Sequence, residues 1–290
     1  MIPNKLIPEA RPKILDYFYD KDGNIIGKVG GIFLNRCSWE KEDTIKEFIL
    51  AIEELRDDNT VSLIIEEPSL LSVQSINLIE DETNLKVFNK VKASMKLLPL
   101  VLNSIYERLG NDLKGKEVLI IGDDKECTKK VIESICKDIS FITLTGYYED
   151  DEIENIYEYI LENTGLSIFY SKNIDRILTN YSIVINLIDN YCLNTQKLRK
   201  EAIVFDLSID GKITSNIIGN SKATIIEDFV FKGDGLNIKR TKFLSSLVYA
   251  YIYEQMGEFK LENLDGLYVN GQIYKIRDLV DYKIKSKGKL

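Results

Sequence analysis

The residues with the clearest potential for chemistry lie in a turn that follows a short apolar run. Glu117–Ile121 predicts a buried strand, and Gly122, Asp123 and Asp124 follow it directly. A dinucleotide-binding turn of the form G-x-G-x-x-G would have glycines at positions 122, 124 and 127. This chain has Gly122, Asp124 and Cys127 at those positions, so the first glycine of the motif is present and the other two are replaced.

Two interpretations of the carboxylates in this turn are open. In the first, amides at the start of the following helix bind a phosphate, and the Asp124 carboxylate lies beside that dianion at a cost of about 1 kcal/mol or more. In the second, Asp123 and Asp124 cap the helix. The next strand ends at Thr145, and the same choice applies to Glu149 and Asp150, which would contact a ribose or cap a helix.

Polar residues also mark the ends of two later strands. Asn186 and Asp189 lie where the fourth predicted strand ends, and Asp206 and Ser208 lie where the fifth ends. Because the carboxyl ends of parallel strands border the ligand crevice of an open α/β sheet, these residues are candidates for lining a pocket. Turn formation is the alternative role for polar residues at such positions.

The absence of histidine limits the possible mechanisms. The chain has 0 histidines, which excludes a Ser-His-Asp triad, a Cys-His pair and any zinc site with histidine ligands. We predict no metal site. Cys37, which follows Arg36, is the one candidate nucleophile, because a neighbouring cation would lower the pKa of its thiol. A small apolar packing role is the alternative for Cys37.

Charge and composition limit the partners. The net charge of −8 argues against nucleic acid, which requires a basic face. No apolar stretch reaches membrane-spanning length, so we expect no membrane association. The 4 cysteines form no C-x-x-C pair and no secretory leader is evident, which favours the cytoplasm. One of Tyr249, Tyr251 and Tyr253 on a late helix could face a partner subunit in a homodimer, and core packing is the alternative for these tyrosines.

Apolar runs and helical patterns alternate through the middle of the chain. Six runs predict strands: Glu117–Ile121, Ser140–Thr145, Leu166–Tyr170, Ile183–Leu187, Ala202–Leu207 and Ala223–Ile226. Helical patterns lie between them at Glu126–Cys136, Glu152–Asn163, Ile174–Leu178 and Thr195–Lys200. Short, apolar strands in this rhythm are typical of a parallel sheet with helices on both faces. The predicted fold class is therefore α/β, with a Rossmann-like, mostly parallel, doubly wound sheet preceded by a smaller α/β domain.

The flanking regions predict the domain organisation. Thr44–Arg56 has the spacing of an amphipathic helix, and Leu85–Leu109 predicts a long helix that Pro99 should kink or interrupt. A later helix spans Asn237–Met256, and Gly266–Ile276 is predicted to be a hairpin. We expect an amino-terminal α/β domain at 1–110, used for substrate binding or dimerisation, and a Rossmann-like domain at 111–236. The helix and hairpin of 237–290 are expected to pack back on the first domain.

This order of elements resembles the two-domain Rossmann oxidoreductases of the shikimate dehydrogenase and glutamyl-tRNA reductase type. The resemblance is carried by Leu113–Gly122, Tyr181–Leu187 and Ala202–Ser208, with a long helix before them and a returning helix after them. It implies an NAD- or NADP-dependent oxidoreductase that acts on a small metabolite in a cleft between domains. The lysine motif of shikimate dehydrogenase is not found here, and Cys37 stands near the place of the reductase's cysteine without the surrounding motif.

The sequence leaves three functional hypotheses. The first is a divergent NAD(P)-dependent oxidoreductase. The second is a non-catalytic binding or regulatory protein that has lost its dinucleotide site. The third is an enzyme that binds another nucleotide or metabolite at the same crevice. The candidate cofactor-binding residues are Gly122, Asp123, Asp124, Thr145, Asn186, Asp206 and Ser208.

Overall fold

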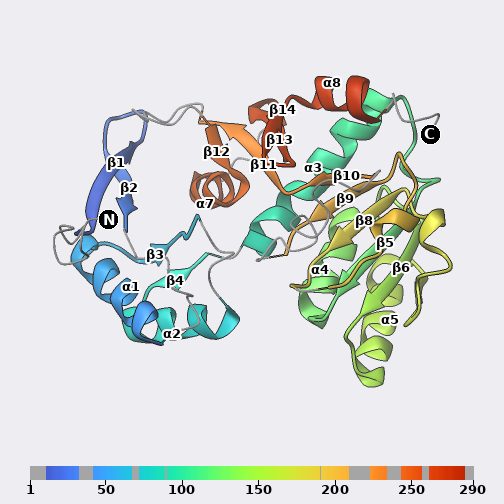
Figure 1. The fold of residues 1–290 in the computed structure, drawn as a ribbon, viewed down its shortest axis with the longest axis horizontal. Coiled ribbons are helices and arrows are strands. Elements are labelled where there is room, and N and C mark those ends of the chain that lie inside the picture. The colour runs from blue at the N-terminus through green and yellow to red at the C-terminus, as the bar shows by residue number, and fades with distance from the viewer. Residues whose placement is uncertain are drawn as a thin grey trace, which may run out of the picture. The chain divides into compact units, whose positions relative to one another are not determined.

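The computed structural model describes residues 11–32, 42–66, 72–88, 90–189, 191–208, 223–233, 243–256 and 261–284 (Figure 1). The chain divides into two compact units. The first consists of Met1–Phe88 with Gly233–Lys242, and the second of Asn89–Lys232 with Phe243–Leu290. The division therefore falls at Phe88 and not after residue 110, because the long helix that follows packs within the second unit.

The first unit begins with an antiparallel hairpin of β1 (Lys13–Tyr19) and β2 (Ile25–Gly31). Its tip is organised by the carboxylate of Asp20, which accepts hydrogen bonds from the backbone amides of Asp22 and Asn24 at 2.9 and 2.8 Å.

The rest of the first unit packs two helices around a small apolar cluster. The helices are α1 (Glu42–Leu55) and α2 (Val73–Thr83), and a short parallel pair joins β3 (Ser62–Leu63) to β4 (Lys86–Val87). The apolar face predicted for α1 is buried against residues of α2 and the segment after it; the cluster includes Ile45, Phe48, Ile52, Ile79 and Leu85. The helix expected from Leu85 onward is wrong at its start, because Lys86–Val87 pair as β4 and the helix begins only at Lys90. It then continues through Pro99 to Leu109 without the predicted interruption.

The second unit is built on a six-stranded parallel sheet with the order β10-β9-β8-β5-β6-β7. The strands are β5 (Glu117–Gly122), β6 (Phe141–Gly146), β7 (Ile168–Tyr170), β8 (Ile183–Asn186), β9 (Ile203–Asp206) and β10 (Thr224–Ile226). All six were predicted, because fully buried parallel strands appear in sequence as short continuous apolar runs. The α/β, Rossmann-like fold class is confirmed.

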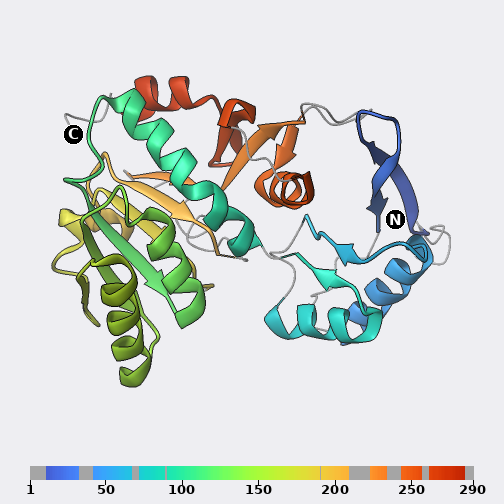
Figure 2. The ribbon, with the colours of Figure 1, turned by 180° about the vertical axis from the view of Figure 1, so that it is seen from behind.

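Helices α3 (Lys90–Leu109), α4 (Lys125–Ile135) and α5 (Asp150–Thr164) lie on one face of this sheet (Figure 2). On the other face, the two expected helices are replaced by 3-10 turns at Leu178–Asn180 and Thr195–Lys197. Segments this short cannot repay the cost of nucleating an α-helix, and they bury only one or two apolar side chains each. Within the described residues, α-helices therefore cover one face of the parallel sheet. The other face, where helices were also predicted, has 3-10 turns instead.

A second, antiparallel sheet of order β12-β11-β13-β14 also belongs to the second unit. Its strands are β11 (Asp228–Lys232), β12 (Phe243–Ser245), β13 (Leu264–Val269) and β14 (Gln272–Tyr274). The predicted hairpin is confirmed, and its turn uses positive φ at Asn270 and Gly271.

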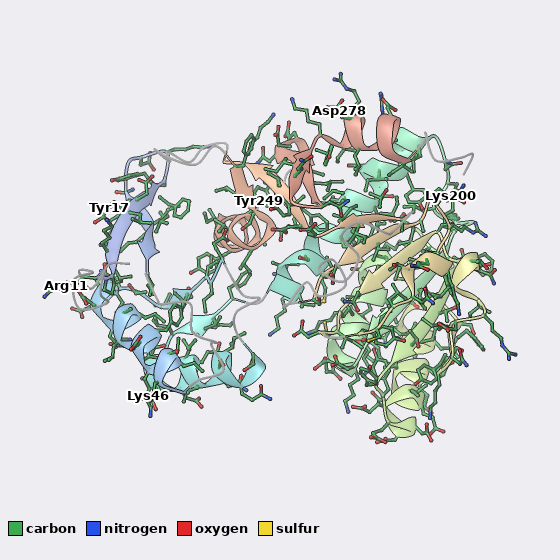
Figure 3. The ribbon with its side chains drawn as sticks, viewed as in Figure 1. Arg11, Tyr17, Lys46, Lys200, Tyr249 and Asp278 are labelled. Atoms are coloured by element: carbon green, nitrogen blue, oxygen red, sulfur yellow. The ribbon has the colours of Figure 1, made fainter. Side chains whose placement is uncertain are left out.

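Helix α7 (Ser246–Met256) packs on this sheet and on α3. Tyr249, labelled in Figure 3, is fully buried and stacks on Phe231 with ring centroids 3.9 Å apart. The chain continues through α8 (Ile276–Asp278) into a π-helical turn at Leu279–Ile284, where Asp281 pairs with Arg108 of α3 at 2.6 Å. The described residues from Phe243 onward thus pack within the second unit, and Tyr249 lies in its core.

In the described part of the chain, no helix has the length and apolar character needed to cross a bilayer.

Candidate ligand site at the carboxyl edge of the parallel sheet

The predicted polar residues come together in one row at the carboxyl edge of the parallel sheet. Strand register places Ile121 of β5 beside Thr145 of β6 on one side and beside Asn186 of β8 on the other. Asn186 in turn lies opposite Asp206 of β9. The chain order reverses between β5 and β8, and in open α/β sheets ligands bind at the carboxyl ends of the strands at such a reversal. This edge is therefore the candidate site.

The turn from β5 into α4 is capped by its own carboxylate. Asp124 is the N-cap of α4, and its Oδ1 accepts a hydrogen bond from the backbone amide of Cys127 at 2.6 Å. The capping interpretation of Asp124 is confirmed. One of the amides that a phosphate would need at this helix start already has an anionic partner.

Gly122 is required by close packing from two other segments. A Cβ at position 122 would collide with the hydroxyl oxygen of Tyr148 and lie 2.6 Å from Oγ1 of Thr128. Those two hydroxyls are hydrogen-bonded to each other at 2.6 Å. The backbone carbonyl of Gly122 also accepts from the amide of Tyr147 at 3.1 Å. The side chain of Tyr148 thus occupies the space that the missing Cβ leaves.

The same turn is electrostatically unfavourable for a second anion. Burial, with a further contribution from Asp124, raises the pKa of Asp123. Burial also raises the pKa of the Tyr148 hydroxyl, and Asp123 and Asp124 add to that rise. The Cys127 thiol is raised to a pKa of about 12 by burial and by the same two carboxylates. Its Sγ lies 3.5 Å from Sδ of Met95 on α3, so Cys127 is a packing residue.

The ends of β8 and β9 form a buried polar network. The Asn186 amide nitrogen donates to Oδ1 of Asp206 at 3.0 Å and to the carbonyl of Ile188 at 2.9 Å. The Ser208 hydroxyl donates to the same Asp206 oxygen at 2.6 Å. All three polar side chains are fully buried. The network joins two strands and shapes the turn after β8, and its contact with a ligand stays a prediction.

The end of β6 is likewise used by the protein itself. Glu149 is the N-cap of α5 in a capping box, and its backbone amide donates to the Glu152 carboxylate at 3.1 Å. Thr145 is buried and hydrogen-bonded to the hydroxyl of Tyr191. The ring of Tyr191 lies 5.7 Å from that of Tyr147, which is 64% exposed. A pair of aromatic rings, with Tyr147 exposed and Tyr191 partly buried, therefore lies beside the row of strand ends.

Sequence reasoning missed the roles of Tyr148 and Tyr191. Tyr147 and Tyr148 are adjacent and chemically identical, and no sequence pattern distinguishes the exposed one from the buried one. Gly146, with φ 135° and its Cα against the carbonyl of Gly122, sets the direction of the chain after β6. That contact between two strands is a tertiary property. Cys37 lies outside the described residues, so its assignment as a nucleophile stays a prediction.

The dinucleotide implied by the resemblance would require two features at this edge. A glycine at the second motif position would let its pyrophosphate approach the β5–α4 turn closely, and an acidic residue after the second strand would meet its ribose. Asp124 occupies that second glycine position and supplies an anion at the helix start. Glu149 is engaged in capping α5. The residues present do not fit a pyrophosphate bound in the usual way at this turn.

Comparisons with known proteins give distant structural matches. The sequence matches no protein-family profile, and no curated protein is similar to it in sequence. Among solved structures, shikimate dehydrogenase from Aquifex aeolicus is 11% identical, with a TM-score of 0.32, over 48% of this chain and 49% of that one. L-tryptophan dehydrogenase from Nostoc punctiforme is 14% identical, with a TM-score of 0.34, over 61% of this chain and 49% of that one.

A third match is aspartate transcarbamoylase from Trypanosoma cruzi, which is 13% identical with a TM-score of 0.37 over 62% of this chain and 63% of that one. Proteins of the expected dehydrogenase type are therefore among the matches. The chain spans about half the length of the two dehydrogenases. TM-scores this low do not establish a common fold over whole chains, and the architecture rests on the strand order described above.

Proposed function

We propose that this chain binds a small metabolite at the carboxyl edge of its parallel sheet, as a divergent relative of the NAD(P)-dependent oxidoreductases whose dinucleotide site is closed. The observation that carries the proposal is the strand order, with its reversal between β5 and β8. That reversal is where open α/β sheets bind their ligands. The carboxylates of Asp123 and Asp124 favour a neutral or cationic metabolite over a phosphorylated one.

The proposal is tested by screening metabolites for thermal stabilisation of the purified protein and confirming each hit by calorimetry. The screen contains matched neutral, cationic, carboxylate and phosphorylated compounds. Two variants locate the site at which a confirmed ligand binds. D123K reverses a charge at the carboxyl end of β5, and E117K makes the same change at the opposite end of that strand. We expect D123K to weaken a cationic ligand at least tenfold and E117K to leave it within about twofold, since tenfold corresponds to about 1.4 kcal/mol. Equal effects of the two variants would contradict the location.

An active NAD(P)-dependent oxidoreductase is the second candidate, because the order β7-β6-β5-β8-β9-β10 is that of the dinucleotide-binding fold. In this case the pyrophosphate would bind away from the start of α4. Titration with NAD(H) and NADP(H), followed by calorimetry and protein fluorescence, decides between the two. Saturable binding at micromolar concentrations would favour the oxidoreductase, and no binding at millimolar concentrations would remove it.

Assembly and location are part of the same proposal. Cys127, Cys136 and Cys192 are free thiols, which supports a reducing, cytoplasmic setting. A homodimer is proposed as the assembly, and sedimentation velocity tests it. A single monomeric species at micromolar concentration would contradict the homodimer.

A further inference from the structure

We propose that two copies of this chain dimerise through the face of β6 and β7 that carries Phe141 and Phe169, here called the uncovered face, with the uncovered faces of the two copies meeting. The inference rests on the homodimer of the proposed function and names the surface that forms it. Tyr249 of α7, which the sequence offered for such a contact, is fully buried.

The uncovered face lacks a layer that parallel sheets normally have. Thr143 of β6 lies opposite Phe169 of β7, and residues two apart in a strand share a face, so Phe141 and Phe169 lie on the same side of the sheet. Each of the two rings is 58% exposed. Parallel sheets are almost always covered on both faces, and grouped apolar side chains at a surface mark contact sites. This part of the sheet is therefore a candidate interface.

The neighbouring part of the same face is covered. There the segments around the two 3-10 turns bury an apolar cluster that includes residues of β5, β8, β9 and β10, among them Leu119, Val184, Val204 and Ile225. In the described part of the chain, this cluster includes no residue of β6 or β7. The covering layer ends near Thr143, whose side chain is hydrogen-bonded to that of Tyr181. The two phenylalanines lie beyond it.

Charge decides how a second copy meets this part of the sheet. On the opposite face, α5 packs beside β7 and has acidic side chains but no lysine or arginine; the acidic residues are Asp150, Asp151, Glu152, Glu154, Glu158 and Glu162. Pairing of the outer strand β7 with its copy, edge to edge, would bring two such helices together, and like charges repel. Contact between the two uncovered faces leaves both helices on the outside of the dimer.

The uncovered side of the sheet also has opposite charges that a two-fold arrangement can pair. Glu117 of β5 lies opposite Phe141 in the strand register. Arg176 lies between Ile174 and Leu178, which are buried against the same side of the sheet. Both charged side chains are exposed, and neither forms a salt bridge within the described residues. In an isologous interface, Glu117 of each copy can pair with Arg176 of the other.

The area needed for a stable dimer indicates how far the contact extends. The two exposed rings supply on the order of 200 Å² of apolar surface. A stable interface buries about 800 Å² on each partner. The segment that carries Arg176 must therefore take part in the contact together with the two rings.

The first test is sedimentation velocity of the full chain over a range of concentrations. We expect the unmodified protein to dimerise at micromolar concentrations. F141T/F169T removes both rings and keeps a residue that suits strands, and it should weaken the dimer at least about tenfold. F243T/I273T changes two exposed apolar residues of the antiparallel sheet and should leave the dissociation constant within about twofold.

A second test uses charge and does not depend on the folding of F141T/F169T. R176E should weaken the dimer, and E117R/R176E, which exchanges the two charges, should restore it. Added salt should also weaken the dimer, because it screens the pairing of Glu117 with Arg176. A dimer formed edge to edge would instead strengthen with salt, because the repulsion between the two α5 helices would be screened.

The outcomes separate this surface from the proposed function. A dimer that F141T/F169T leaves intact, that F243T/I273T weakens equally, that E117R/R176E does not restore or that strengthens with salt would overturn the surface and leave the homodimer. A monomeric unmodified protein would overturn both. A metabolite hit that D123K weakens would keep the ligand site of the proposed function in every one of these cases.

Discussion

The turns after β5 and β8, which flank the chain reversal, depend on opposite features of their residues. The β5 turn requires the absence of a side chain at Gly122, because Tyr148 and Thr128 are packed against it. The β8 turn requires the presence of particular polar atoms, because Asn186 joins Asp206 and the carbonyl of Ile188. The stability of the β5 turn is therefore sensitive to added side-chain volume, and the stability of the β8 turn is sensitive to the loss of hydrogen bonds.

The largest effect is expected from adding a methyl group to Gly122. G122A should lower the free energy of unfolding by about 3 kcal/mol, because the new Cβ collides with the hydroxyl of Tyr148. Gly115 is the matched control, since a Cβ there has no atom within 4 Å. G115A should change stability by no more than about 0.5 kcal/mol. Urea denaturation measures both, and equal effects would contradict the packing at Gly122.

A somewhat smaller loss is expected at the β8 end. N186A removes three hydrogen bonds from a fully buried side chain, including the donor to Asp206, so it should cost about 2 kcal/mol. Asn103 donates to Asp138 at 3.1 Å at an exposed position, and N103A should cost less than about 0.5 kcal/mol. Thermal unfolding of the two variants checks the difference. A cost for N103A that matched N186A would show that burial of the network is not the cause.

The hydroxyl of Tyr148 can be compared with that of Tyr106, another buried tyrosine. Y148F removes the hydrogen bond to Thr128 and should cost about 1 kcal/mol. The Tyr106 hydroxyl is buried on α3 and has no hydrogen-bond partner in the described part of the chain. Y106F should therefore be neutral or slightly stabilising. Denaturant unfolding that showed Y106F to be the more costly change would contradict this comparison.

The smallest effect is expected from the charge of Asp123. Burial and Asp124 raise its pKa, so the ionised carboxylate destabilises the folded state relative to the unfolded chain at neutral pH. D123N should increase the free energy of unfolding by roughly 0.3 kcal/mol at pH 7. The gain is small because the carboxylate is only partly removed from water and solvent screens its charge. The gain should shrink as pH falls through the raised pKa and vanish below the ordinary value of 3.8. Thermal unfolding at several pH values tests this, and a gain independent of pH would contradict it.

Local and periodic features of the chain were predictable from its residues. The strand predicted at Glu117–Ile121 is observed at Glu117–Gly122, because a buried parallel strand is a continuous apolar run. The turn at Asn270 and Gly271 was predicted because those residues tolerate positive φ. The carboxyl-edge row of Thr145, Asn186 and Asp206 followed from the expectation that all these strands are parallel.

Features that depend on packing between distant segments were not predictable. The helices expected at Ile174–Leu178 and Thr195–Lys200 are 3-10 turns, since such short segments take their shape from the sheet face they cover. The division at Phe88 arises because α3 packs on α4 and α7. Strand β11 was missed because its partners, β12 and β13, lie later in the chain.

The sequence by itself determined the six strands of the parallel sheet, the acidic charge, the absence of imidazole chemistry and the replacement of two glycines in the β5 turn. These are properties of composition and short-range periodicity. Only the tertiary structure decided that Asp124 caps α4 and that Tyr148, and not Tyr147, lies against Gly122. The reason is physical. The sequence allows Asp124 either role, and the backbone geometry of the folded turn selects the cap. The direction of a side chain after β6 is set by how closely two strands and a helix approach one another.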